Sequence, residues 1–278
     1  MKIEKIKLIT FSPTHTSKQV GEAIVQGTGI LTTETVDLTL ATPVGEIVVD
    51  ADELAVITVP VYGGHVAPLA MKRLESIHSE GAPAVLVAVY GNRAYEKALT
   101  ELDAFVRVRG LKVIAGATFI GEHSYSSKQH PIAVGRPDAA DLAYAEEFGN
   151  KVAVKIADAP DYEHLYGVAV ANIRRPKQPI WPMLKFIRQV MKWRKHPVPM
   201  PRTPKADAQL CKQCGLCARH CPTGAIRPGD ECNTIAEICI KCCACVKVCP
   251  HKARTFDTPF APLLSANFSR RKEPQIII

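Results

Sequence analysis

The stretches CKQCGLCARHCP, residues 211–222, and CIKCCACVKVCP, residues 239–250, share the spacing C-x2-C-x2-C-x3-C-P. Three cysteines separated by two residues each can wrap around one face of a cubic iron–sulfur cluster. The fourth cysteine stands beside a turn fixed by proline and points away, toward a second cluster. The sequence therefore predicts two 4Fe-4S clusters. One is held by Cys211, Cys214, Cys217 and Cys249, and the other by Cys239, Cys242, Cys245 and Cys221.

Zinc is the alternative for a thiolate-rich segment, because it also binds four cysteines arranged in C-x2-C pairs. A zinc site needs only two such pairs. It does not explain the third evenly spaced cysteine, or the Cys-Pro that follows it, in each of the two motifs, so the spacing favours iron–sulfur clusters. Cys232 and Cys243 are left over and are expected to be unligated thiols.

The cysteines also indicate the compartment. All ten lie between residues 211 and 249, and a disulfide framework would distribute them over the fold that it crosslinks. This concentration predicts metal binding in a reducing compartment, the cytoplasm.

The composition is that of a globular protein large enough for two domains: 278 residues, 47% hydrophobic and 22% charged. No apolar run approaches the roughly 20 residues of a membrane span, and the N-terminus has no signal-peptide core, so neither a transmembrane segment nor secretion is expected. Charge is uneven. Residues 1–160 carry 15 Lys and Arg against 19 Asp and Glu, and residues 161–278 carry 20 against 8. A basic C-terminal half suggests a nucleic-acid partner. Each oxidised cluster with its four thiolates would add a charge of about −2, which offsets part of the positive charge, so no nucleic-acid partner is expected.

Strand and helix patterns alternate along the first 160 residues. Strands are expected at 5–11, 33–37, 53–59, 84–90 and 112–119. Helices are expected at 17–26, 68–77, 93–109 and from Asp138 to about residue 157. This alternation predicts an α/β fold, a doubly wound five-stranded parallel sheet. Ligands bind such sheets at the carboxyl ends of the strands.

Three loops at these ends suit flavin mononucleotide (FMN). The first joins hydroxyl groups to backbone amides at a helix N-terminus, a neutral site for phosphate. The next two each combine an aromatic residue with glycine, which lets backbone approach a planar ring. The candidate FMN-binding residues are Ser12, Thr14, His15, Thr16 and Ser17, then Tyr62, Gly63 and Gly64, then Gly91, Asn92, Arg93 and Tyr95. No Gly-x-Gly-x-x-Gly follows a strand, so a Rossmann nicotinamide site is not supported, and no catalytic residue is assigned.

Residues 1–158 resemble flavodoxins, and residues 206–258 resemble two-cluster bacterial ferredoxins, with a turn at Gly215 and alanines at 225 and 253. The whole chain resembles the flavodoxin–ferredoxin fusion proteins of anaerobic bacteria. The segments that carry this resemblance are FSPT at 11–14, PVYGG at 60–64, VYGNRAY at 89–95, FIGEHS at 119–124, GRPD at 135–138 and RKEP at 271–274. The resemblance implies one FMN, two clusters and electron transfer. A flavodoxin phosphate loop usually has the pattern Ser/Thr-x-Thr-Gly-x-Thr, and His15 stands where that pattern has glycine.

The expected domains are an FMN-binding domain at 1–158, a basic linker at 159–205, a small α+β ferredoxin domain at 206–258 and a tail at 259–278. The linker contains an amphipathic helix at 180–195. Ile180, Met183, Leu184, Ile187, Val190 and Met191 share one face, and Lys185, Arg188, Lys192 and Lys195 mostly face away. Such a helix can pack as a linker, make peripheral contact with an anionic membrane, or dock to an acidic redox partner protein.

These observations favour an electron carrier that passes electrons between FMN, the clusters and a redox partner. Two alternatives stay open: a flavin-dependent reductase with a small substrate at the FMN, and a non-catalytic regulatory protein with an empty flavin site.

Overall fold

The computed structural model of the chain describes residues 3–41 and 45–278. Residues 1–2 and 42–44, which belong to the expected first domain, lie outside the described residues. The chain forms two compact units that alternate along the sequence. The first unit contains Met1–Glu122, Gly135–Pro176 and Lys272–Ile278, and the second contains His123–Val134 and Lys177–Arg271. Residues 159–176 and the last seven residues thus belong to the first unit.

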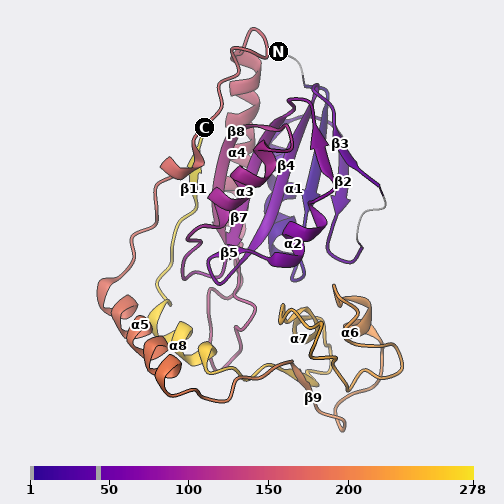
Figure 1. The fold of residues 1–278 in the computed structure, drawn as a ribbon, viewed down its shortest axis with the longest axis vertical. Helices are drawn as coiled ribbons and strands as arrows, with labels where there is room; N and C mark the ends of the chain where they lie inside the picture. The colour runs from indigo at the N-terminus through magenta and orange to yellow at the C-terminus, as the bar shows by residue number, and fades with distance from the viewer. Residues whose placement is uncertain (1–2, 42–44) are drawn as a thin grey trace. The chain divides into compact units, whose positions relative to one another are not determined.

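The first unit is built on a parallel sheet with one antiparallel edge (Figure 1). Its order is β11-β8-β7-β4-β1-β2, and β5 pairs with β4. The bounds are β1 (Lys5–Thr10), β2 (Thr32–Asp37), β4 (Glu53–Tyr62), β5 (His65–Val66), β7 (Pro83–Tyr90), β8 (Lys112–Ile120) and β11 (Gln275–Ile277), with β3 (Ile47–Val49) and β6 (Ile77–Ser79) forming a separate small parallel pair. The five predicted strands pair in parallel. Their spatial order, second-first-third-fourth-fifth, is that of the flavodoxin-like sheet. The predicted fold class is confirmed, and the sequence missed the added edge strand.

The helices of this unit are α1 (Thr16–Thr28), α2 (Pro68–Arg73), α3 (Ala98–Arg107), α4 (Ala139–Asp158) and the 3-10 turn η1 (Val170–Asn172). Helices α1 and α4 approach closely because both have a glycine at the contact. A Cβ on Gly27 would lie 1.9 Å from the carbonyl oxygen of Glu146, and one on Gly149 would lie 2.0 Å from that of Ile24. Asp138 caps α4, as predicted, by accepting from the amides of Ala140 and Asp141.

Two predicted helices are shorter in the structure. The helix expected at 68–77 ends at Arg73, and Ile77 begins β6, which pairs with β3. The helix expected at 93–109 starts at Ala98, because Glu96 has a φ of 44°, which an α-helix does not accommodate. The core fills the space between sheet and helices with fully buried aliphatic and aromatic side chains, among them Ile6, Val56, Val87, Phe119 and Phe148.

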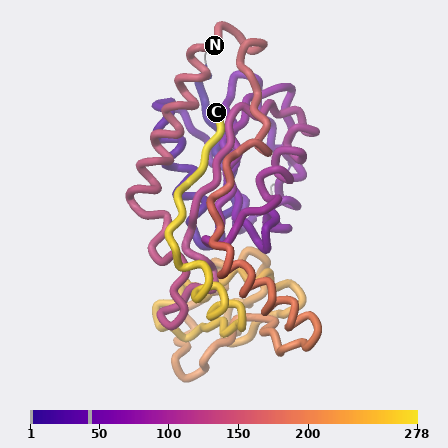
Figure 2. Tube along the Cα trace, turned by 90° about the vertical axis from the view of Figure 1, so that its left-hand side faces the viewer, coloured from indigo at the N-terminus to yellow at the C-terminus, as the bar shows by residue number. Residues whose placement is uncertain are grey.

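The second unit has little regular structure. Its elements are α5 (Ile180–Lys195), α6 (Leu216–Arg219), α7 (Ala244–Lys247), α8 (Phe260–Asn267) and the antiparallel pair of β9 (Lys205–Ala206) with β10 (Arg254–Thr255). Helices α5 and α8 lie side by side (Figure 2). No helix within the described ranges is both long and apolar enough to cross a bilayer.

Candidate functional site

The loop between β1 and α1 brings the five predicted phosphate-binding residues together at a helix N-terminus. Ser12 and Ser17 are buried, Thr14 and Thr16 are half-buried, and His15 is exposed. His15 has φ 65° and ψ −9°, which is the left-handed conformation that glycine adopts without strain. The histidine therefore stands at a position whose backbone suits glycine.

Several amides of this loop are already hydrogen-bonded. The Ser12 amide donates to Thr39 Oγ1 at 2.8 Å, that of His15 donates to the Ser12 carbonyl oxygen at 3.0 Å, and that of Lys18 donates to Ser12 Oγ at 3.1 Å. These bonds hold the loop in shape without a ligand.

Other donors in the same loop are left for a ligand. Over the described parts of the chain, the amides of Thr14, Thr16 and Ser17 have no acceptor, and the buried Ser17 Oγ has no hydrogen-bond partner. A buried hydroxyl without a partner is costly, and amides at the first turn of a helix attract anions. The loop therefore fits the phosphate of FMN.

Two residues that support this loop were missed by the sequence analysis. Arg73 of α2 is buried, and its Nη1 donates to the carbonyl oxygens of Leu38 and Thr39, each at 2.6 Å. Thr39 in turn accepts from the Ser12 amide. Burial lowers the pKa of Arg73. Nothing in the local pattern around Arg73 or Thr39 signals this role, because the contacts join distant parts of the sequence.

The second loop is a tight hairpin between β4 and β5. Tyr62 pairs with His65, and Gly63 and Gly64 between them have φ angles of 64° and 96°. Tyr62 is half-buried. The φ of 96° at Gly64 is a conformation that residues with a Cβ rarely adopt, and a Cβ there would also lie 2.3 Å from a carboxylate oxygen of Glu96, so the position favours glycine.

The third loop follows β7 and is partly in the interior. Asn92 is buried at φ 63°, and Tyr95 is buried with its ring edge-on to Tyr90, the centroids 5.7 Å apart. Gly91 and Arg93 are half-buried. Of the predicted residues in the second and third loops, Tyr62, Gly63, Gly91 and Arg93 are therefore accessible to a flavin ring, whereas Asn92 and Tyr95 shape the loop from inside.

Contacts join these loops into one edge. The Lys97 amide donates to the Gly64 carbonyl oxygen at 2.9 Å, and the Gly121 amide donates to the Tyr90 carbonyl oxygen at 3.0 Å. A Cβ on Gly121 would lie 3.1 Å from Thr16, so the loop after β8 lies against the phosphate loop. The C-terminal segment contributes as well, because Lys272 Nζ donates to the Arg93 carbonyl oxygen at 2.6 Å.

The two cysteine motifs of the second unit form an internal repeat in the backbone as well as in sequence. Positions 28 residues apart share the left-handed conformation: Gln213 and Lys241 at φ 50° and 57°, Gly215 and Cys243 at 73° and 58°, and Gly224 and Lys252 at 65° and 51°. The fourth cysteine of each motif accepts a backbone N–H bond at sulfur. Ala225 donates to Cys221 Sγ at 3.2 Å, and Ala253 donates to Cys249 Sγ at 3.3 Å.

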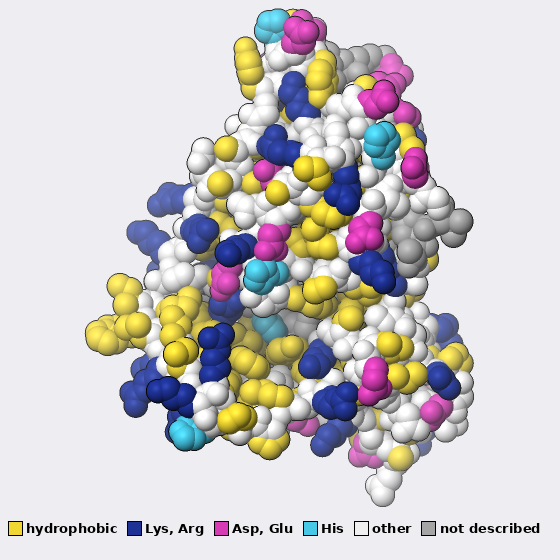
Figure 3. All heavy atoms as spheres, viewed as in Figure 1, with side chains coloured by type: hydrophobic (Ala, Val, Ile, Leu, Met, Phe, Trp, Pro, Cys, Tyr) yellow, Lys and Arg dark blue, Asp and Glu magenta, His cyan; other side chains and the backbone are white. Residues whose placement is uncertain are grey.

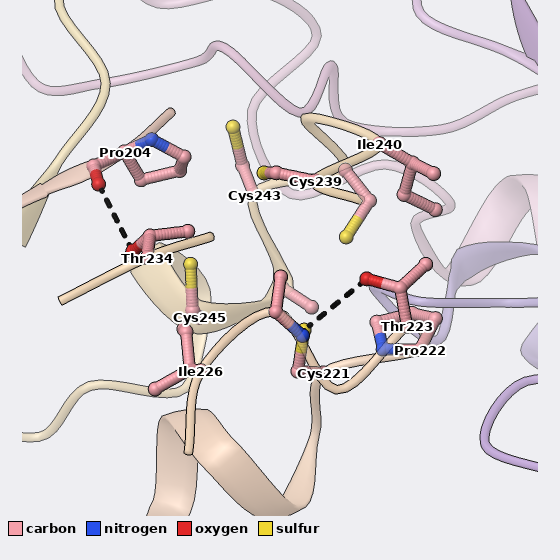
Figure 4. Close-up of a pocket in the computed structure, with 13 residues that line it drawn as sticks. Pro204, Cys221, Pro222, Thr223, Ile226, Thr234, Cys239, Ile240, Cys243 and Cys245 are labelled. Atoms are coloured by element: carbon pink, nitrogen blue, oxygen red, sulfur yellow. Dashed lines mark hydrogen bonds between the residues drawn. The ribbon is translucent and has the colours of Figure 1, made fainter. Parts of the chain in front are cut away.

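One cavity joins cysteines from both motifs (Figure 4). Cys221 of the first motif lines it together with Cys239, Cys242, Cys243 and Cys245 of the second. The cavity contains about 310 Å³ of empty space, part of it open to solvent. Over the described residues, no three His, Cys, Asp or Glu side chains are grouped as a site for a single metal ion.

Burial makes these thiols reluctant to ionise without a cation. It raises the pKa of Cys242 to about 12 and that of Cys245 to about 11, and it raises the pKa of Cys239 as well. Iron ions supply the charge that stabilises such buried thiolates, so this donor set fits a cluster. Arg254, which the sequence analysis missed, is buried nearby, and its positive charge lowers the pKa of the Cys245 thiol against the larger effect of burial.

The two extra cysteines differ in their surroundings. Cys243 occupies the position equivalent to Gly215; it is buried, and its Sγ lies 3.6 Å from the Lys241 carbonyl oxygen. Cys232 is half-buried, and a hydrogen bond with Cys211 raises its pKa.

The family model for the 4Fe-4S binding domain matches residues 204–227. No curated protein sequence matches the chain. Among solved structures, the chain is similar to an archaeal flavodoxin, with 14% identity, a TM-score of 0.36, and 55% of this chain and 99% of that one covered. It is similar to the two-electron reduced flavodoxin of Megasphaera elsdenii, with 14% identity, a TM-score of 0.33, and 54% and 98% covered. It is also similar to an FMN-dependent NADH-azoreductase from Bacillus anthracis str. Ames Ancestor, with 12% identity, a TM-score of 0.38, and 57% and 100% covered.

The strand order of the first unit and the matched segment of the second define the architecture. The chain combines a flavodoxin-like domain with a 4Fe-4S ferredoxin domain, as the sequence predicts.

Proposed function

We propose that this chain is a cytoplasmic electron-transfer protein that holds one FMN and two 4Fe-4S clusters and exchanges electrons with a separate redox protein. The observation that carries the proposal is the cavity in which Cys221 meets Cys239, Cys242 and Cys245. A cysteine from one motif beside three from the other is the ligand exchange of two-cluster ferredoxins.

The internal repeat supports the other cluster. Because Cys249 is equivalent to Cys221 in spacing, backbone and N–H···S bonding, the same exchange assigns it to Cys211, Cys214 and Cys217. Hydrogen bonds from Ala225 and Ala253 to the crossing sulfurs stabilise the thiolate form and favour a higher reduction potential.

The phosphate loop supports FMN. Thr14, Thr16 and Ser17 would donate amide and hydroxyl hydrogen bonds to the phosphate, and Tyr62, Gly63, Gly91 and Arg93 would flank the ring. Bound FMN can exchange electrons in pairs or singly, whereas each cluster carries one electron at a time. The chain could therefore couple two-electron transfer to one-electron transfer.

The exposure of the cysteines suggests where electrons leave. Cys214 is exposed, whereas Cys242 and Cys245 are buried. The first cluster would therefore lie nearer the surface of its unit. Lys212 beside it is exposed too, so the partner that docks there would present acidic groups.

The test is anaerobic purification with iron, sulfide, zinc and flavin quantified. We expect about eight irons and about eight sulfides per chain, with FMN bound or taken up on titration. Cys242→Ala should lower the iron content and leave FMN binding unchanged. Ser17→Ala should weaken FMN binding and leave the iron content unchanged. A colourless protein with stoichiometric zinc would refute the clusters, and no FMN uptake would refute the flavin site. Rapid turnover of a small acceptor without a protein partner would favour a reductase instead.

A further inference from the structure

Helix α5 presents three distinct faces. With 100° between successive residues, Met183, Phe186, Val190 and Trp193 lie on one face, Ile180, Leu184, Ile187 and Met191 lie on the next, and Lys185, Arg188, Lys192 and Lys195 lie on the third. Two of these faces are apolar, but a surface helix needs only one to pack against its own protein.

The first face is the one that packs. Phe186 meets Phe268 with ring centroids 5.3 Å apart, and Trp193 meets Phe260 at 5.2 Å, both from the α8 segment. Met183 and Phe186 join the cluster of Ile132, Leu264 and Phe268. These contacts fix the rotation of α5 within its unit.

The second face remains uncovered. We call Ile180, Leu184, Ile187 and Met191 the exposed stripe, and their exposed fractions are 73%, 50%, 47% and 48%. Trp181, which is 74% exposed, lies 100° around the helix from Ile180, among the basic residues of the third face. No residue of α5 is fully buried. Isolated exposed apolar residues are ordinary, but four along one side of a helix mark an interaction surface.

The third face determines the kind of partner. Residues 180–195 contain five Lys or Arg and no Asp or Glu. Four of the five, Lys185, Arg188, Lys192 and Lys195, form the basic row, which borders the exposed stripe on the side away from α8, whereas Arg194 lies between the two apolar faces. Figure 3 shows hydrophobic and basic side chains gathered together over the region of α5. An aliphatic stripe beside a row of cations, with a tryptophan within that row, matches an interface that is apolar inside and anionic at its surface.

We propose that α5 is a membrane-surface helix, which lies in the plane of an anionic lipid bilayer with the exposed stripe in the acyl boundary and the basic row on the headgroups. An acidic protein would satisfy the cations but would leave most of the aliphatic stripe without a partner. The proposal does not depend on the cofactors, since α5 and α8 pack through their own side chains.

The experiment measures binding of the anaerobically purified full chain to vesicles of phosphatidylcholine with and without phosphatidylglycerol. We expect sedimentation with the anionic vesicles only, weakened by salt. The chain has two tryptophans, so Trp193→Phe leaves Trp181 as the only indole, and its emission should shift to the blue on binding.

Variants test each face. Leu184→Gln with Ile187→Gln should weaken partitioning at least about tenfold. Neutralising Lys185, Arg188 and Lys192 to Gln should weaken it roughly 100-fold. The matched control is Leu31→Gln with Val108→Gln, two exposed aliphatic residues of the other unit, which should bind as the parent does. Far-UV circular dichroism and the thermal unfolding transition report that each variant is folded.

Four outcomes would overturn the proposal. The first two are binding to neutral vesicles as tight as to anionic ones, and no binding to anionic vesicles. The other two are Trp181 emission that does not shift on binding, and a Leu184→Gln, Ile187→Gln variant that binds as tightly as the parent. If the chain instead dimerises and the stripe variant is monomeric, a second copy covers α5. If α5 variants lose only the binding of an acidic redox protein, the surface is a protein dock.

Discussion

Replacing His15 with glycine is expected to stabilise the flavodoxin-like domain, although the change removes a side chain. His15 has φ 65° and is the N-terminal cap of α1, yet its side chain makes no capping hydrogen bond. Its backbone carries the geometry: the amide donates to the Ser12 carbonyl oxygen and the carbonyl accepts from Gln19, each at 3.0 Å.

The magnitude follows from two opposing effects. A left-handed conformation costs a residue with a Cβ about 1–2 kcal/mol, and glycine avoids this cost. Glycine also loses about 0.5–1 kcal/mol more conformational entropy on folding. The net gain is about 1 kcal/mol, which for a domain of this size raises Tm by about 2–4 °C.

The assay is scanning calorimetry of the full chain, with His15→Gly compared to His15→Ala. Neither variant has an imidazole, so their difference isolates the backbone. A reference variant, Leu8→Ala, identifies which calorimetric transition belongs to the flavodoxin-like domain. Leu8 is a buried residue of β1, so its truncation should lower the Tm of that transition. Gln19 is an exposed residue inside α1 and serves as the matched control position. There the order should be reversed, and Gln19→Ala should be more stable to unfolding than Gln19→Gly by about 1 kcal/mol.

A glycine variant no more stable than the alanine variant would refute the strain argument. His15→Gly should also bind FMN at least as tightly as the parent, because the donors left in the loop are the amides of Thr14, Thr16 and Ser17 and the Ser17 hydroxyl. Weaker binding would mean that the histidine itself contacts the phosphate.

Three further substitutions test other parts of the chain. Cys221→Ala and Cys242→Ala should abolish the same paramagnetic cluster signal and Cys249→Ala the other, and loss of different signals from the first two would contradict crossed ligation. Burial raises the pKa of Glu53, but hydrogen bonds from two lysines outweigh it and leave the pKa below its ordinary value. Glu53→Gln should therefore cost about 3 kcal/mol in urea unfolding. The parent should lose this advantage as pH falls through the lowered pKa, and a constant difference between the two proteins would refute the ion-pair account. Burial lowers the pKa of Lys272 to about 8, so between pH 8 and its ordinary pKa of 10.5 the unfolded chain binds more protons and stability should rise with pH. Across this pH range the free energy of unfolding should rise by about 3 kcal/mol in the parent and should not rise in Lys272→Met. The same pH dependence in both proteins would show that another group causes it.

The sequence by itself determined the elements whose signals are local. Runs of β-branched residues bounded by turns gave the five parallel strands, the Asp138 cap gave the start of α4, and two spacings of cysteine and proline gave the ferredoxin segment. Each signal arises from interactions within a few residues, so periodicity and turn chemistry are enough to find it.

The tertiary structure decided everything that depends on contacts between distant residues. β11 became an edge strand because its three residues pair with residues 116–118. Arg73 supports the phosphate loop through Thr39, which stands 34 residues before it in the sequence and accepts from the Ser12 amide. The exposed stripe of α5 was predicted as part of an apolar face, but only the aromatic contacts with Phe260 and Phe268 show that a different side of the helix packs. A pattern of polar and apolar residues limits which faces can be buried. Which one is buried depends on the shape and number of partners that the rest of the chain brings to it, and that information is not local in the sequence.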